Sequence, residues 1–485
     1  MPATYSYDSG TDSYFVTGGC GDATIIITDT HNDGTNGTKP VTRIVDGAFL
    51  DCADLQTLVI GNNVTIIGNE AFKNCIYMTS ATISNSVTTI GNSAFYSCGF
   101  LDNITMGNSV ITIGTFAFYR CGFSNITLPS TLTSIGSSAF WESSITSIVI
   151  PNSVTTLEDS IFVQCGSLAS LTLPSNGTIN TVPQGLCVLC TSLTSITIPS
   201  NYTTIAQDAF IFAGLRNVTL NEGLLTIGLQ AFYGCPLDQG EFIVPNSVTS
   251  IGVRAFEATG GARFVIGTGV TELPSHTFYN SDMTDISFRS PSSLITIGPG
   301  CFALCNLLNN LYIPDSVQNI IFQSIDQNCF PYDDPPFYNA VRQGGTVRIG
   351  SGLIFPPRNI YTTRPPTSPP CTWAYGSQAL SNLGKILTNL GGTTLILGKS
   401  ITSIDSTSFS GLLSFFSRAS GSPRRTFIFE GRMTSIGVNT FISVSNPSNI
   451  YFNGDFTNPF SLGESRFIKF TDRVYINPKI GIRID

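Results

Sequence analysis

Apolar and polar positions repeat along this chain with a period in the low twenties. Each unit runs Val-Thr-x-Ile-Gly, then Ala-Phe, then Cys, as in Asn85–Cys98 (NSVTTIGNSAFYSC) and Asn108–Cys121 (NSVITIGTFAFYRC). The anchors of the units fall at Phe49, Phe72, Phe95, Phe118, Phe140, Phe162, Phe210, Phe232, Phe256, Phe278 and Phe302, with Cys187 once in the same position. A fixed period of this length predicts a solenoid, in which each coil packs against its neighbours.

The segment after each cysteine alternates apolar with polar residues, which is typical of a strand with one buried face. Pairs such as Ile126 with Leu128 and Ile148 with Ile150 are expected to point inward. The alternate positions are expected to point outward: Asn103, Thr105, Asn125, Thr127, Ser147, Val149, Ser170, Thr172, Ser195, Thr197, Asn217 and Thr219. Stacking these strands in parallel predicts one long sheet.

The residues between the glycine and the cysteine, such as Asn69–Lys73, read as one short helical turn that docks its Ala-Phe pair on the neighbouring coils. The glycine before this turn recurs at Gly68, Gly91, Gly114, Gly136, Gly228, Gly252 and Gly298. Its recurrence predicts a position that needs either a positive φ or a close backbone approach. The predicted fold class is an α/β-type solenoid, mostly β, with parallel strands, short helical turns and β caps.

The repeats divide the chain into four regions. Residues 1–46 are expected to form an N-terminal β cap and first loop, 47–320 the regular repeats, 321–392 a proline-rich irregular insertion, and 393–485 degenerate repeats with a C-terminal cap. Proline in PYDDPPFYN and TTRPPTSPPCTW opposes regular helix and sheet in the insertion. Its aromatic residues, Phe337 and Tyr338 among them, indicate that it packs back on the array or docks a partner.

Composition and charge exclude some classes of function. The chain is 42% hydrophobic and 11% charged, with a net charge of −8, so it lacks the basic footprint that nucleic-acid binding requires. No apolar run approaches the roughly 18–20 residues that span a bilayer, and the N-terminal segment has no recognisable secretory signal. We therefore expect neither a nucleic-acid partner nor a membrane span.

Cysteine follows the anchor by three residues in most coils, at Cys52, Cys75, Cys98, Cys121, Cys165, Cys190, Cys235 and Cys305. Equivalent positions of adjacent coils lie about 4.8 Å apart, and parallel side chains do not bridge easily. We interpret these residues as a column of small buried thiols that pack as hydrophobic side chains, not as a metal site. The odd total of 13 cysteines, with no visible signal, favours a reducing compartment.

Residues that carry chemistry are sparse. There are two histidines, His31 and His276, and none of the common hydrolase, metalloprotease or nucleotide-binding motifs. The Asp/Asn loop around Asp33 lacks EF-hand spacing, because Pro40 stands where a bidentate glutamate is needed. We interpret this loop as a turn, with a Ca²⁺ site as the alternative. The sequence predicts no enzyme and no cofactor.

The units resemble the BspA-like class of leucine-rich repeats. Leu193–Pro199 reads LTSITIP and Ser247–Phe256 reads SVTSIGVRAF, and the resemblance is dense over Val41–Val317. It implies a leucine-rich-repeat array. Proteins with such repeats include bacterial surface adhesins, protist surface proteins and products of large DNA viruses, so the resemblance implies binding or assembly functions.

Two hypotheses follow. The first is a non-catalytic structural or interaction protein of a larger assembly, such as a virion protein of a large DNA virus, in contact with assembly neighbours. The alternative is a cell-surface adhesin that binds a host protein or glycan through its sheet face. The sparse charges and missing signal favour a virion or cytoplasmic location over secretion. The expected partner-binding residues are Asn103, Thr105, Asn125, Thr127, Thr172, Ser195, Thr197, Asn217, Thr219, Phe337 and Tyr338.

Overall fold

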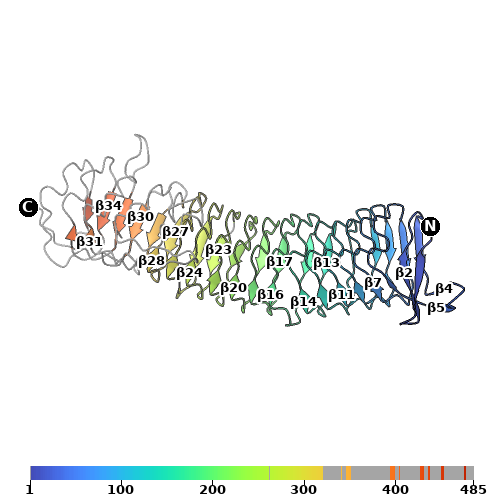
Figure 1. Cartoon of the computed structure of the whole chain (residues 1–485). Coiled ribbons are helices and arrows are strands. Elements are labelled where there is room, and N and C mark those ends of the chain that lie inside the picture. Colours follow the sequence, from blue (N-terminus) through green and yellow to red (C-terminus); the bar gives the residue numbers. More distant parts are fainter. Residues whose placement is uncertain are drawn as a thin grey trace, which may run out of the picture. The chain divides into compact units, whose positions relative to one another are not determined.

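The computed structural model describes residues 2–261, 263–320, 340, 346–350, 394–398, 403–404, 426–430, 435–436, 449–452 and 474–476. The chain forms two compact units, Met1–Cys235 and Pro236–Asp485. Within each unit, successive coils add short parallel strands to two separate ladders (Figure 1). The predicted solenoid of parallel strands is therefore confirmed.

The first unit begins with a cap in which antiparallel pairing changes to parallel pairing. Strand β1 (Thr4–Asp8) pairs antiparallel with β2 (Ser13–Gly18), and β4 (Thr30–Asn32) pairs antiparallel with β5 (Thr38–Ile44). Strand β2 also pairs parallel with β5, which continues parallel into the coils. The cap thus covers the first edge of one of the ladders and sets its direction.

The first ladder of this unit comes from the alternating segments, but its hydrogen bonds divide it into separate sheets of four, two and two strands, so the prediction of one long sheet is wrong. Its strands are β3 (Thr24–Ile27), β6 (Thr57–Ile60), β8 (Ser80–Thr82), β10 (Asn103–Thr105), β13 (Ser147–Val149), β15 (Ser170–Thr172), β17 (Ser195–Thr197) and β19 (Asn217–Thr219). A single bridge, Asn125 to Ser147, joins the coil that has no full strand. Ile148 and Ile196 point inward and are buried, as the alternation predicts.

The second ladder is a feature that the sequence pattern does not predict. It is built from two-residue strands, mostly Thr-Ile or a similar pair, that end directly before the recurring glycine or its equivalent: β7 (Ile66–Ile67), β9 (Thr89–Ile90), β11 (Thr112–Ile113), β12 (Ser134–Ile135), β14 (Thr156–Leu157), β16 (Thr181–Val182), β18 (Thr204–Ile205) and β20 (Thr226–Ile227). Two residues are too few to show a strand period. Pairing with the neighbouring coils makes them strands.

The second unit repeats this plan. One ladder holds β21 (Glu241–Ile243), β23 (Arg263–Ile266), β25 (Asp285–Phe288), β27 (Asn310–Ile313), β29 (Thr346–Ile349), β30 (Thr394–Leu397), β32 (Thr426–Phe429), β34 (Asn449–Phe452) and β35 (Val474–Ile476). The other ladder holds β22 (Ser250–Ile251), β24 (Glu272–Leu273), β26 (Thr296–Ile297), β28 (Asn319–Ile320), β31 (Ser403–Ile404) and β33 (Ser435–Ile436). Paired strands of both kinds therefore recur between residues 394 and 476.

The anchors stack on one another in the core. Phe72, Phe95 and Phe118 are fully buried, and their ring centroids are 5.2 and 5.5 Å apart along the stack. Phe256 and Phe278 stack in the same way at 5.3 Å in the second unit. Parallel coils bring equivalent residues to about the inter-strand spacing, so one aromatic residue per coil is enough to build a column.

The turns predicted to be helical are not helices in the described residues. Two residues in each turn have positive φ, for example Glu70 (54°) and Asn74 (60°). The Phe72 N–H donates to the Ala94 carbonyl of the next coil at 2.8 Å, whereas the Lys73 N–H closes a tight turn to the Glu70 carbonyl at 3.1 Å. A helix would direct every N–H along its own axis. In these turns, every second N–H group instead donates to a carbonyl of the next coil.

The recurring glycine is explained by close approach and not by positive φ. A Cβ atom on Gly91 would lie 2.7 Å from both the Asn69 nitrogen and the Gly68 carbonyl carbon of the preceding coil. Gly114 meets Gly91 and Asn92 in the same way. At Gly91 and Gly114 the missing side chain therefore lets the backbones of adjacent coils approach closely. Other coils carry a side chain at the equivalent position, for example Glu158 and Ala206.

Candidate functional site

The outward side chains of the first ladder form a polar face, which we define by the twelve positions predicted to point outward between Asn103 and Thr219. Parallel register holds them in columns: Ser147 lies beside Ser170 and Val149 beside Thr172, and Ser195 beside Asn217 with Thr197 beside Thr219. The nine predicted binding residues in this range are all exposed: Asn103, Thr105, Asn125, Thr127, Thr172, Ser195, Thr197, Asn217 and Thr219.

Most of these side chains make no hydrogen bond to other groups in the described residues. Within the described residues, the hydroxyls of Thr105, Thr127, Thr172, Thr197 and Thr219 make no hydrogen bond to protein. Thr105, Thr172, Thr197 and Thr219 lie in strands that are paired with a neighbouring coil, so the fold does not need their hydroxyls. The polar face therefore presents repeated donors and acceptors to the surroundings.

The face has no ionisable group, which limits its chemistry to hydrogen bonding and contact. Val149, 64% exposed, is its one large apolar member. The corresponding face of the second unit is different: Arg263 forms ion pairs with Glu241 at 3.6 Å and with Asp285 at 3.3 Å. The uncharged character is thus a property of the first unit's strands.

Two predicted binding residues, Phe337 and Tyr338, lie outside the described residues, as does almost all of the 321–392 insertion. Their expected role stays a prediction. The predicted division into regions 1–46, 47–320, 321–392 and 393–485 likewise stays a prediction.

The cysteine column is more ordered than simple packing would require. Each thiol donates to the main-chain carbonyl of the anchor in the preceding coil: Cys75 to Phe49 at 3.2 Å, and Cys98 to Phe72 at 3.3 Å. Cys165, Cys190, Cys235 and Cys305 make the same contact. A thiol is a weak donor of the right size to satisfy this carbonyl.

The interpretation of one cysteine of the column was wrong. Cys52 is not a free thiol but is disulfide-bonded to Cys20, with the Cα atoms 5.4 Å apart. Cys20 lies in the cap, outside the repeat, so the argument that side chains within one column do not bridge does not apply to it. The bond ties the cap to the first coil.

We expect the remaining thiols to resist alkylation in the native protein. Burial raises the pKa of Cys75 to about 12 and raises those of Cys98 and Cys121 as well. Since the thiolate is the reactive form, N-ethylmaleimide should leave the nine buried free cysteines of the described chain unmodified at neutral pH. Intact-mass measurement before and after unfolding in denaturant checks this. Full labelling of the native protein would contradict the buried column.

His276 and Asp33, two further residues singled out by the sequence, each have a structural environment in the described part of the chain. His276 is buried in a coil turn, where its Nδ1 lies 2.5 Å from the Ser275 hydroxyl. The Asp33 carboxylate accepts hydrogen bonds from the N–H groups of Thr35 and Asn36, which lower its pKa and fit a turn. No group of three or more potential metal ligands gathers in the part of the chain that the structure describes.

A buried carboxyl group in the second unit predicts a pH effect on stability. Burial raises the pKa of Glu257 to about 7 from its ordinary value of 4.5, although Arg254 at 3.3 Å lowers it. The folded state therefore binds the Glu257 proton more tightly than the unfolded state does. This difference stabilises the folded state fully below about pH 4.5, and the stabilisation is lost as the pH rises through about 7. We expect Glu257→Gln to raise the urea midpoint at about pH 8 and to flatten its pH dependence. Identical pH profiles for the two proteins would contradict this.

Comparisons with known proteins agree with the geometry. The model of the BspA type leucine rich repeat region, which contains six copies, matches residues 36–144, 111–239 and 226–333, more than half of the chain. A leucine-rich repeat protein from Bacteroides ovatus is 23% identical, covers 71% of this chain and 92% of its own, and has a TM-score of 0.50. A leucine rich cell surface protein from Faecalibacterium prausnitzii is 20% identical over 72% of this chain and 87% of its own, with a TM-score of 0.35.

At this level of identity the structural similarity shows the fold alone. The sequence matches none of the curated proteins to which it was compared. Among the described residues, no helix has the length and apolar character that crossing a membrane requires.

Proposed function

The chain belongs to the BspA-type leucine-rich repeat family, and on that basis we propose that it is a non-catalytic recognition scaffold that acts outside the cytoplasm and binds a partner protein through the polar face. The observation that carries the proposal is the set of exposed side chains from Asn103 to Thr219, most of which make no hydrogen bond to the protein and which lie in register in β13–β15 and β17–β19. Within the pairs β13–β15 and β17–β19, hydrogen bonds hold these groups at a fixed spacing, so little conformational entropy is lost when they bind.

The composition of the polar face favours a protein partner. Hydroxyl and amide groups adapt to many hydrogen-bonding partners, as Ser and Asn do in antibody paratopes. No charge has to be desolvated, and solenoids generally bind through such extended surfaces.

The Cys20–Cys52 disulfide supports a location outside the cytoplasm, because disulfides persist mainly in oxidising compartments. The sequence alone favours a reducing compartment. The disulfide instead supports the alternative hypothesis, an exposed recognition protein. The virion role stays a prediction. Both roles are compatible in a protein exposed on the outside of a particle.

Site-specific photocrosslinking tests the proposal. A photoreactive amino acid replaces Thr172 or Thr197 on the polar face, and Thr156 on the second ladder serves as the exposed control. Irradiation of the protein in its native setting should give one discrete adduct, identified by mass spectrometry, from both face positions and not from the control. Equal crosslinking at all three positions, or none at Thr172 and Thr197, would reject the polar face as the binding surface.

A further inference from the structure

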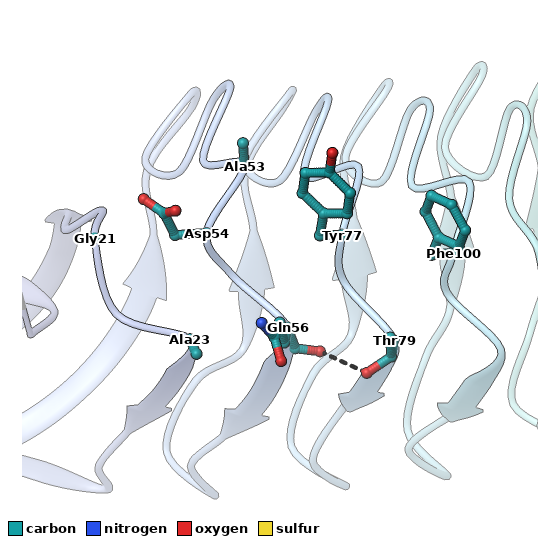
Figure 2. A pocket seen from close by; sticks show the side chains of 8 residues that line it. All are labelled: Gly21, Ala23, Ala53, Asp54, Gln56, Tyr77, Thr79 and Phe100. Carbon is teal, nitrogen blue, oxygen red and sulfur yellow. Dashed lines mark hydrogen bonds between the residues drawn. The ribbon is translucent and has the colours of Figure 1, made fainter.

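A small open depression lies beside the first ladder of the first unit, at coils that precede the polar face. Its volume is about 430 Å³ and it is lined by Gly21, Ala23, Ala53, Asp54, Gln56, Tyr77, Thr79 and Phe100. This volume is within the roughly 300–1,000 Å³ of typical ligand sites. Figure 2 shows Tyr77 and Phe100 side by side on successive coils, with Asp54 on the coil before them.

The repeat itself creates the depression. Asp54, Tyr77 and Phe100 occupy equivalent positions, each two residues after the column cysteine. This position holds an aromatic ring in two successive coils and a carboxylate in the coil before them. Two small residues, Gly21 and Ala53, line the adjoining wall. The step from rings to small side chains leaves one side of Tyr77 open toward Asp54.

The two rings are far more exposed than the core anchors. Tyr77 is 53% exposed and Phe100 is 58% exposed, and the rings stack with centroids 6.0 Å apart. The fold gains little from holding two adjacent aromatic side chains in water. A contiguous exposed apolar group beside a depression is typical of a binding site.

Polar groups accompany the rings. The side chains of Asp54 and Gln56 are exposed and make no hydrogen bond within the described residues. The Thr79 hydroxyl donates to the Gln56 main-chain carbonyl at 3.2 Å, so its oxygen remains an acceptor (Figure 2). The depression thus offers a carboxylate acceptor, a carboxamide with donor and acceptor, and a hydroxyl acceptor around an aromatic wall.

We propose that this depression binds a neutral sugar residue of a glycan. The lining has one carboxylate and no cation, which disfavours acidic glycans and other anions. A pyranose has an apolar C–H face that stacks on an aromatic ring and hydroxyl groups on its edge that donate to Asp54 and bond with Gln56. A purely apolar ligand would leave these polar groups unpaired at a cost.

The orientation of the rings also fits a chain of sugars. Tyr77 and Phe100 follow the solenoid from coil to coil, so a second sugar residue would continue over Phe100. The site is separate from the polar face and does not depend on the protein partner proposed there. If no sugar binds, the photocrosslinking result is unaffected. If photocrosslinking rejects the polar face, the sugar-binding test is likewise unaffected.

Binding of neutral tetrasaccharides to the full chain tests the proposal. The probes are glucose, mannose, galactose and N-acetylglucosamine tetrasaccharides, with heparin as the acidic comparison, measured by isothermal titration calorimetry. At least one neutral probe should bind, and Tyr77→Ala should weaken that binding about tenfold or more, as expected for loss of a central aromatic contact. Tyr312→Ala is the matched control, because Tyr312 is 51% exposed on a strand of the second unit. It should bind like the unaltered protein.

Three results would overturn the proposal: no neutral probe binds, heparin binds more tightly than every neutral probe, or Tyr77→Ala binds unchanged. Sedimentation velocity tests the other possible occupant of the depression, which is a second copy of this chain. If the unaltered protein self-associates and Tyr77→Ala does not, the rings form an interface between copies and the sugar site is rejected. Circular dichroism confirms that both variants keep their strands, which is expected because both side chains are exposed.

Discussion

Phe118→Ala should lower the free energy of unfolding by about 3–5 kcal/mol, the range for truncating a buried aromatic side chain. Phe118 is fully buried, with Phe95 and Phe140 stacked on its two faces at 5.5 Å each and Phe123 against its edge at 5.7 Å. Removing the ring leaves a cavity between three others. The coils cannot close over it, because the ladders on either side fix the distance between them.

Urea unfolding followed by far-ultraviolet circular dichroism measures this effect. Phe100→Ala is the matched control: the same substitution, in the preceding coil, at a ring that is 58% exposed. Its effect should stay within about 0.5 kcal/mol. Equal losses for the two variants would contradict the stacked column as the source of stability. Hydrogen exchange should show the loss of protection centred on the coil of Phe118, since solenoid stability is shared mainly between neighbours.

Gly114→Ala should also destabilise the protein, although it adds only one carbon atom. The new Cβ would lie 2.6 Å from the Asn92 side-chain oxygen and 2.7 Å from the Asn92 nitrogen and the Gly91 carbonyl carbon. Two of these are backbone atoms of the preceding coil: the Asn92 N–H donates to the Asn69 side-chain oxygen at 2.8 Å, and the Gly91 carbonyl accepts from the Ala94 N–H at 3.3 Å. The coils must therefore separate locally. We expect a loss of about 1–3 kcal/mol, as for other overpacked sites.

Gly99→Ala is the control for that substitution and should have the opposite sign. A Cβ atom on Gly99 would meet nothing closer than the Arg120 carbonyl oxygen at 3.9 Å, and Gly99 has no positive φ. Replacing glycine at such a site stabilises by about 0.4–1 kcal/mol, because the unfolded chain loses freedom. The same urea titration compares the two variants. A stable Gly114→Ala protein would show that the coils are not in contact at the recurring glycine.

Local pattern along the chain is enough to predict much of this architecture. The spacing of Phe72, Phe95 and Phe118 predicts a solenoid, and the alternation around Ile148 predicts which side chains of the first ladder are buried. Both predictions succeed for the same reason: in a solenoid, each residue meets its equivalent in the next coil. The period in the sequence is therefore also the period of the contacts.

Other features depend on contacts that no local pattern contains. The second ladder, with strands such as Thr89–Ile90, forms because neighbouring coils supply hydrogen bonds, and bonds between coils also replace the helical turns that the sequence predicts. The choice between positive φ and close approach at Gly91 requires the position of the preceding coil.

The candidate sites divide in the same way. Alternation alone predicts the exposed Ser, Thr and Asn positions of the polar face, because side-chain direction in a strand follows directly from it. The pairing of Cys52 with Cys20 was decided by the tertiary structure instead. Cys20 lies in the cap, outside the repeat, so the period of the sequence contains no information about which coil it contacts.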